Sequence, residues 1–285
     1  MSANQATALV LAGGGSFGAV QVGMLRALVA HGVTPDLMVG SSVGAINGAY
    51  FAGAPNADGV AQLEAIWRSL RRSEVFPIAW RSVLRLLVNG GAAVDSSGLR
   101  RLLEQCLPYQ TFERAAVPLH VVATDLMAGG TVRLSSGPVV DAVLASCAIP
   151  AVFSPVRLGE RHLIDGAVAS NTPVSIAVEL GAKRVIVLPT GFACALESPP
   201  RGAIASALHA ITLLIAHQLA MEFERYHEQA EIIIVPPLCP LAASPYDFSR
   251  AGELIERAAE QTRRWLDRGG LTRQRIPQAL LAHSH

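Results

Sequence analysis

Residues 40–44 form a Gly-x-Ser-x-Gly pentapeptide with Ser42 at its centre. A short apolar run precedes it and a helical pattern follows, so we expect Ser42 on a sharp strand-to-helix turn. Such a turn lifts the serine hydroxyl clear of the sheet, and Gly40 and Gly44 let the neighbouring chain pass without a Cβ clash. The pattern is typical of a serine nucleophile. A glycine-rich connection with a serine capping the helix is the alternative interpretation.

A second glycine-rich loop, residues 13–18, lies between the first predicted strand and the first predicted helix. Successive amides in such a loop can converge on one point and hold negative charge, as an oxyanion hole does in acyl transfer. The candidate donors are Gly13, Gly14, Gly15, Ser16, Phe17 and Gly18.

The same loop also fits the dinucleotide-binding fingerprint. That use requires an acidic residue at the end of the second strand to hold a ribose. Here the second strand ends in Gly40 and Ser41, and Asp36 lies at its beginning. A nucleotide- or phosphate-binding module on residues 13–18 is therefore kept as an alternative.

A serine nucleophile needs a proton acceptor, and Asp165 is the candidate. It ends the predicted strand at 162–164 and precedes Gly166 and Ala167. The inner histidines show no local partner pattern, and the last two histidines lie close to the end of the chain. An ordinary Asp-Gly turn would explain the same residues. The two glycine motifs favour the catalytic interpretation.

The elements that must position these residues alternate along the chain. Apolar runs predict strands at 6–11, 36–39, 117–124, 131–134, 156–158, 162–164, 184–188 and 231–235. Helical spacing predicts helices at 19–31, 45–52, 58–72, 97–106, 138–145, 173–180, 202–226 and 249–268. This alternation predicts a mostly parallel sheet covered by helices.

The composition favours a buried core. The chain has 285 residues, of which 51% are hydrophobic and only 16% are charged, against about 25% charged residues in typical soluble proteins. Its net charge of +1 and the absence of a long basic run argue against nucleic-acid binding. The cysteines show no metal-binding or redox spacing; they are Cys106, Cys147, Cys194 and Cys239.

Neither the start of the chain nor its longest apolar stretch predicts a membrane anchor. Residues 1–8 contain no basic n-region, and polar residues interrupt the longest apolar stretch, 203–220. We therefore predict a soluble, cytoplasmic protein, with a single domain over residues 1–268 and a partly disordered C-terminal tail over residues 269–285.

The three motifs, in this order, resemble those of the patatin-like phospholipase family, in a match from roughly Thr7 to Val235. The resemblance implies a three-layer α/β/α fold and a Ser-Asp dyad in which Ser42 attacks the ester and Asp165 accepts its proton. The resemblance also implies that the amides of the loop 13–18 form the oxyanion hole and that residues 145–150 support the site. The family usually has Arg or Lys where Phe17 stands, and Ala167 is a variant of a glycine.

We therefore expect a lipolytic acyl hydrolase of the phospholipase A, lysophospholipase or esterase type. It would act on a lipid or lysolipid without a metal or an organic cofactor. A catalytically silent lipid-binding relative is a further alternative.

Two segments suggest partners. The basic and apolar segment Arg68–Val88 suits contact with a membrane surface, or else a cover packed on the core. The largely apolar helix predicted at 202–226 is either central or paired with a second subunit.

Overall fold

The computed structural model describes residues 6–71, 95–150, 152–191, 203–241, 244 and 247–281. The side chains of residues 203–209, 211, 212 and 216 are outside that description. Most of the basic and apolar segment suggested for membrane contact, from residue 72 onward, also lies outside the described residues.

In the described part of the chain, eight strands form one sheet in the order β5-β6-β3-β2-β1-β7-β8, with β4 paired to β3. The strands are β1 Thr7–Leu11, β2 Leu37–Ser41, β3 Leu119–Asp125, β4 Thr131–Leu134, β5 Val156–Leu158, β6 Arg161–Asp165, β7 Arg184–Leu188 and β8 Glu231–Ile234. The five central strands β3, β2, β1, β7 and β8 are parallel, whereas β4, β5 and β6 add antiparallel pairs. The predicted mostly parallel sheet is confirmed.

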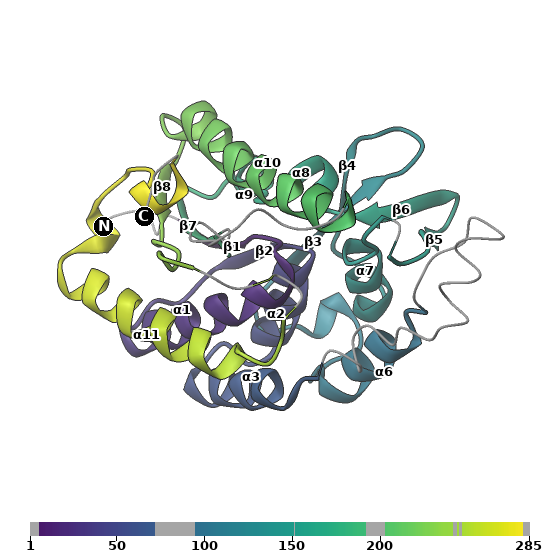
Figure 1. Cartoon of the computed structure of the whole chain (residues 1–285), viewed down its shortest axis with the longest axis horizontal. Helices are drawn as coiled ribbons and strands as arrows, with labels where there is room; N and C mark the ends of the chain where they lie inside the picture. The colour runs from purple at the N-terminus through teal and green to yellow at the C-terminus, as the bar shows by residue number, and fades with distance from the viewer. Residues whose placement is uncertain are drawn as a thin grey trace.

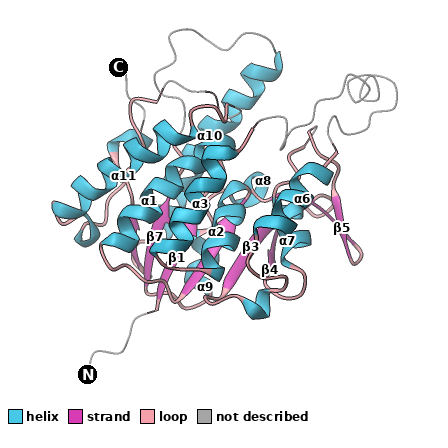
Figure 2. Ribbon diagram, turned by 90° about the horizontal axis from the view of Figure 1, so that it is seen from below, coloured by secondary structure: helices cyan, strands magenta, loops and turns pink. Residues whose placement is uncertain are grey.

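Helices cover both faces of this sheet and complete a three-layer α/β/α arrangement. The described helices are α1 Gly18–Ala30, α2 Val43–Gly53, α3 Ala57–Ser69, α6 Ser97–Cys106, α7 Val139–Ser146, α8 Ala167–Ser170, α9 Val174–Glu179, α10 Ala203–Tyr226 and α11 Ala251–Asp267. Helices α8, α9 and α10 lie on one side of the strands (Figure 1). Figure 2 shows α1, α2, α3 and α11 together in front of the opposite face.

Strand β1 shows how the sequence specifies the two faces. Successive side chains of a strand point to opposite sides of the sheet. Leu9 and Leu11 accordingly join the core beneath α1, α2 and α11, while Ala8 and Val10 join the core beneath α9 and α10. All four side chains are buried. This explains why the central strands are continuous apolar runs rather than alternating ones.

The C-terminal part, predicted as a partly disordered tail, contains short helical turns in its described residues. Between residues 269 and 281 the chain forms two short 3-10 helices, Gly270–Thr272 and Gln278–Leu280. The side chain of Leu280 is buried in the core beneath α10. No helix in the described part of the chain is long and apolar enough to cross a bilayer.

One face of helix α10 packs against the core, and another face is exposed to solvent. Leu219 and Phe223 are buried in the core that α9 shares, whereas Leu213, Leu214 and Met221 are exposed. That this helix is either central or paired with a second subunit stays a prediction.

Candidate active site

Strands β2 and β6 meet end to end along one edge of β3. Parallel β2 pairs with β3 as far as Ser41, which lies opposite Val122. Antiparallel β6 ends at Asp165, which lies opposite the next residue, Ala123. Strand β4 occupies the other edge of the same residues. The residue after β2, Ser42, is thereby brought to the last residue of β6 although 123 positions separate them in sequence.

Ser42 has the strained backbone expected of a nucleophile at a strand-to-helix turn. Its φ of 53° is the one positive φ outside glycine among the described residues, in a region that costs a side chain free energy. A Cβ on Gly40 would lie 2.5 Å from the carbonyl oxygen of Gly44, and one on Gly44 would lie 2.2 Å from that of Leu11. Both glycines are required by close backbone approach, as the motif predicted.

The hydroxyl of Ser42 donates a hydrogen bond of 2.7 Å to Oδ2 of Asp165. The other carboxylate oxygen, Oδ1, accepts the backbone N–H of Ala167 at 2.8 Å, which fixes the carboxylate plane. Asp165 is only 3% exposed. Burial raises the pKa of Asp165 to about 6, although the hydrogen bonds from Ser42 and Ala167 lower it. The carboxylate is therefore ionised at neutral pH and is more basic than an exposed aspartate.

Gly166 completes the close packing around the dyad. A Cβ on this residue would lie 2.2 Å from the carbonyl oxygen of Val122 and 2.5 Å from Oγ of Ser41. No larger residue fits between Asp165 and the end of β2 without moving backbone. The Asp-Gly pair is thus more than an ordinary turn.

The glycine-rich loop 13–18 runs beside Ser42, because a Cβ on Gly13 would lie 3.0 Å from the Cβ of Ser42. Three of its amides are engaged within the fold. Gly13 donates to the carbonyl of Asn171, Phe17 donates to that of Gly14, and the amide of Gly18 closes the short 3-10 helix Gly15–Phe17.

The other three amides, of Gly14, Gly15 and Ser16, donate to no acceptor among the residues that the structure describes. The backbone at Gly14 and Gly15 has φ of 157° and 59°, values that favour glycine. Gly15 also shares a pocket with Ser42. The loop thus has three successive N–H groups beside Ser42 that could donate to a bound anion.

Thr190, which follows β7, holds the peptide between Gly13 and Gly14. Its buried hydroxyl donates to the carbonyl oxygen of Gly13 at 2.7 Å. Because a trans peptide is planar, its C=O and N–H point in opposite directions. Fixing the Gly13 carbonyl therefore also fixes the direction of the Gly14 N–H. Nothing local in the sequence marks Thr190 as part of the site.

Ser146 holds the elbow from beneath. The backbone N–H of Ser42 donates to Oγ of Ser146 at 2.8 Å, and that hydroxyl donates to the carbonyl oxygen of Val122. The side chain is fully buried. The family resemblance implies a supporting role for residues 145–150, and within them Ser146 contacts the elbow.

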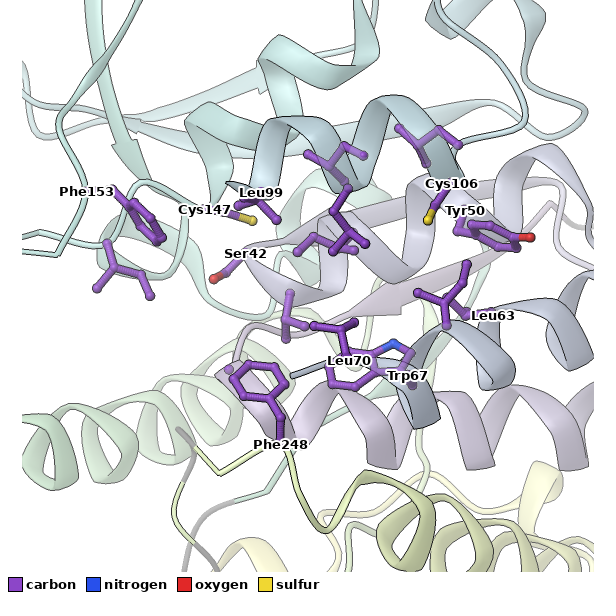
Figure 3. A pocket seen from close by; sticks show the side chains of 18 residues that line it. Ser42, Tyr50, Leu63, Trp67, Leu70, Leu99, Cys106, Cys147, Phe153 and Phe248 are labelled. Atoms are coloured by element: carbon purple, nitrogen blue, oxygen red, sulfur yellow. The ribbon is translucent and has the colours of Figure 1, made fainter. Parts of the chain in front are cut away.

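An apolar pocket opens at Ser42 and runs between α2, α3 and α6 (Figure 3). Its described walls are Val43, Ile46 and Tyr50 from α2, Leu63, Ile66 and Trp67 from α3, and Leu99, Leu102, Leu103 and Cys106 from α6. Leu70, Leu107, Cys147, Ile149, Phe153 and Phe248 complete it. A serine with an ionised base, free amides and an apolar pocket could together hold an ester with a hydrocarbon chain.

A family model described as patatin-like phospholipase matches residues 9–178, which is more than half of the chain. The chain belongs to the patatin-like phospholipase family. The matched segment contains Ser42, Asp165 and the loop 13–18, and members of this family are lipid hydrolases.

Several relatives carry the patatin-like name. Patatin-like phospholipase domain-containing protein 7 of Mus musculus is 29% identical over 193 residues, covering 67% of this chain and 14% of that protein. Protein 6 of Homo sapiens is 31% identical over 186 residues, covering 65% of this chain and 13% of its own length. An uncharacterized NTE family protein of Mycobacterium tuberculosis is 28% identical over 190 residues, covering 66% of this chain and 49% of that protein. The chain thus spans less than half of each relative's length.

Two solved structures align with most of the chain. VipD from Legionella pneumophila is 15% identical with a TM-score of 0.49, covering 93% of this chain and 67% of VipD. Human GIVD cytosolic phospholipase A2, in complex with methyl gamma-linolenyl fluorophosphonate, is 13% identical with a TM-score of 0.45. The alignment covers 97% of this chain and 59% of the phospholipase.

Phe17 occupies the position where patatin-like proteins usually have a basic residue. Its ring is 1% exposed and packs in the core beneath α1 and α2. The side chain stabilises the start of α1 and offers no charge to a headgroup. In the described part of the chain, no cluster of three or more His, Cys, Asp or Glu side chains is placed to hold a metal ion.

Proposed function

We propose that this chain is a lipolytic acyl hydrolase that cleaves carboxylic esters of lipids with Ser42 as nucleophile and Asp165 as general base. The observation that carries the proposal is the 2.7 Å hydrogen bond from the Ser42 hydroxyl to the buried Asp165 carboxylate. Ser42 lies at the opening of an apolar pocket.

In the first step, Ser42 Oγ attacks the ester carbonyl while its proton passes to Oδ2 of Asp165. The pKa of Asp165, raised to about 6 by burial, makes the carboxylate a better proton acceptor than an exposed aspartate. The negative charge that forms on the carbonyl oxygen is stabilised by the amides of Gly14, Gly15 and Ser16, and each such donor contributes about 3–4 kcal/mol.

Collapse of the tetrahedral intermediate expels the alcohol, which takes the proton from Asp165 and leaves the acyl group on Ser42. A water molecule then attacks the acyl-enzyme while Asp165 accepts its proton, and Asp165 passes that proton to Ser42 Oγ as the acyl–oxygen bond breaks and the fatty acid leaves. Ala167 holds the carboxylate in one orientation through both steps.

The nucleotide-binding alternative has less support. Asp36 accepts the backbone N–H of Thr7 at the start of β2, far from where a ribose ligand would be needed. The described lining of the cavity next to the loop is mainly apolar and includes no charged side chain that could pair with a phosphate. A catalytically silent lipid-binding relative would keep the pocket but would not turn over esters.

Peripheral membrane contact through Arg68–Val88 stays a prediction. Arg68 itself forms ion pairs with Glu64 and Glu256 on the described surface. Its charge is therefore largely balanced within the protein, and any attraction to an anionic surface would have to come from the residues that follow.

Release of fatty acid from a lipid panel tests the proposed function. Lysophosphatidylcholine, phosphatidylcholine, monoacylglycerol and a short-chain p-nitrophenyl ester would be incubated with the purified chain in excess EDTA, because no step above requires a metal. We expect turnover of at least one class, and Ser42→Ala should reduce it to the buffer rate.

Ser41→Ala is the matched control, since Ser41 Oγ has no hydrogen-bond partner among the described residues. This variant should retain turnover. Hydrolysis that survives in Ser42→Ala, or no hydrolysis of any ester by folded protein, would argue against the proposal. Loss of activity in EDTA that calcium restores would show that a metal takes part.

A further inference from the structure

The depth of the pocket can be read from the three helices that line it. On α2 the lining extends from Val43 beside the nucleophile to Tyr50, and on α6 from Leu99 to Cys106. Along α3 it extends from Leu70, the residue that caps the helix, back to Leu63. Figure 3 shows Tyr50, Leu63 and Cys106 together at the end away from Ser42, and Leu99 near Cys147 at the nearer end.

The three helices give the same depth. Eight residues separate Ser42 from Tyr50, which is about 12 Å at a rise of 1.5 Å per residue. The seven-residue spans on α3 and α6 correspond to about 10 Å. An extended hydrocarbon chain advances by roughly 1.25 Å per carbon, given single bonds of about 1.5 Å. The pocket is therefore long enough for about eight to ten carbons.

Tyr50 closes the far end. Its ring is buried, and its hydroxyl donates to Oε1 of Gln62 at 2.9 Å, so that α2 and α3 are joined at this point. The side chain of Leu63 and the thiol of Cys106 lie beside the ring. A longer chain would have to displace this hydrogen-bonded ring from its place between the helices.

Beyond Ser42 and Gly15, the described walls offer a polar group only weak partners, the thiols of Cys106 and Cys147. The hydroxyl proton of Tyr50 is donated to Gln62, and Nε1 of Trp67 donates to Oδ1 of the buried Asn47 at 2.8 Å. A hydroxyl or phosphate placed in the pocket would lose its water for few and weak partners, which is unfavourable. The pocket thus selects the acyl chain, and the headgroup must remain at the opening by Gly15 and Ser42.

Resting on the proposed function, we propose that this pocket takes one unbranched acyl chain of about eight to ten carbons, and that Tyr50 sets this limit. With the ring of Tyr50 at the end of the pocket, the protein is a hydrolase for medium-length acyl groups. Shorter chains leave apolar wall unburied, and longer ones meet the ring.

A series of alkyl fluorophosphonates tests this length limit independently of headgroup. Butyl, octyl, decyl and hexadecyl probes would be used below their micelle-forming concentrations, and kinact/KI would be followed by intact mass. We expect the constant to rise from butyl to decyl, by at most about fourfold per methylene buried. The hexadecyl probe should then react at least tenfold more slowly than the decyl probe.

Two substitutions should move the limit in opposite directions. Tyr50→Ala removes the closing ring, so the hexadecyl-to-decyl ratio should rise at least tenfold, whereas Tyr50→Phe keeps the ring and should keep the ratio of the parent. Ile46→Trp fills the pocket about 6 Å nearer to Ser42, one helical turn above Tyr50. It should shift the optimum to about four to six carbons.

The outcomes separate the length limit from the catalytic proposal. If the butyl probe modifies Ser42 but hexadecyl reacts as fast as decyl, or if neither folded substitution moves the optimum, the length limit is wrong and the dyad stands. If no probe of any length reacts with folded protein, the proposed function fails and the length limit with it.

Discussion

Asp165→Asn is expected to lower kcat for ester hydrolysis by about 10²–10⁴-fold, which is the contribution typical of a general base. Asparagine preserves the size of the side chain, and its oxygen can still accept the N–H of Ala167. Its amide nitrogen would donate to Ser42 Oγ where the carboxylate Oδ2 now accepts. The serine proton would then have no acceptor. Ser42→Ala should cost as much or more, up to about 10⁶-fold.

The double variant Ser42→Ala with Asp165→Asn should be scarcely less active than Ser42→Ala alone. Groups that act as one unit lose their joint contribution when either is removed. The control is each of the eight histidines changed singly to glutamine, which should leave far more activity than Asp165→Asn. Near-parent turnover by folded Asp165→Asn, or one histidine variant as inactive as Ser42→Ala, would show that the base is another residue.

The second large effect is the dependence of the activity on pH. Burial raises the pKa of Asp165 to about 6, and only the ionised carboxylate can accept the serine proton. Below that pKa, kcat/KM should therefore fall about tenfold for each pH unit, and above it kcat/KM should level off. At pH 4 the loss should be on the order of a hundredfold.

Initial rates at low concentration of a short-chain ester, measured from pH 4 to 8, would show this acid limb. Circular dichroism at each pH would establish that the protein is still folded. An acid limb centred near pH 4 would mean that Asp165 is ionised as easily as an exposed aspartate. A pH profile unchanged across this range would mean that Asp165 is not the base.

Much of the fold could be predicted because the relevant signals are local. Strand β1 is an unbroken apolar run followed by glycines, and α1 ends where Gly32 takes a positive φ of 79°. The elbow was found because its glycines and serine are adjacent in sequence. By contrast, α8 was missed, since four residues carry no measurable helical period.

Long-range placement could not be predicted. Nothing in the sequence indicates that antiparallel β6 follows β2 along the edge of β3, although this register is what brings Asp165 to Ser42. The pairing of these residues came from the resemblance to a family rather than from the spacing of 123 positions.

In the loop 13–18, too, the local features could be predicted and the long-range contacts could not. Its glycines predicted a set of six amides, and three of them have no acceptor among the described residues. Asn171 and Thr190, which fix Gly13 from its two sides, lie more than 150 residues away in sequence. The pocket is likewise assembled from three separate helices. Each helix shows only an apolar face in the sequence.

Peptide-resolved mass spectrometry after treatment with a fluorophosphonate is the most direct test that Ser42 is a nucleophile activated by Asp165. The reagent forms a stable bond only to a serine whose hydroxyl is deprotonated as it attacks. We predict one adduct, located on Ser42, that forms in the parent and in Ser41→Ala and forms far more slowly in Asp165→Asn. An adduct on Ser41 alone, or no adduct on folded protein, would contradict the assignment.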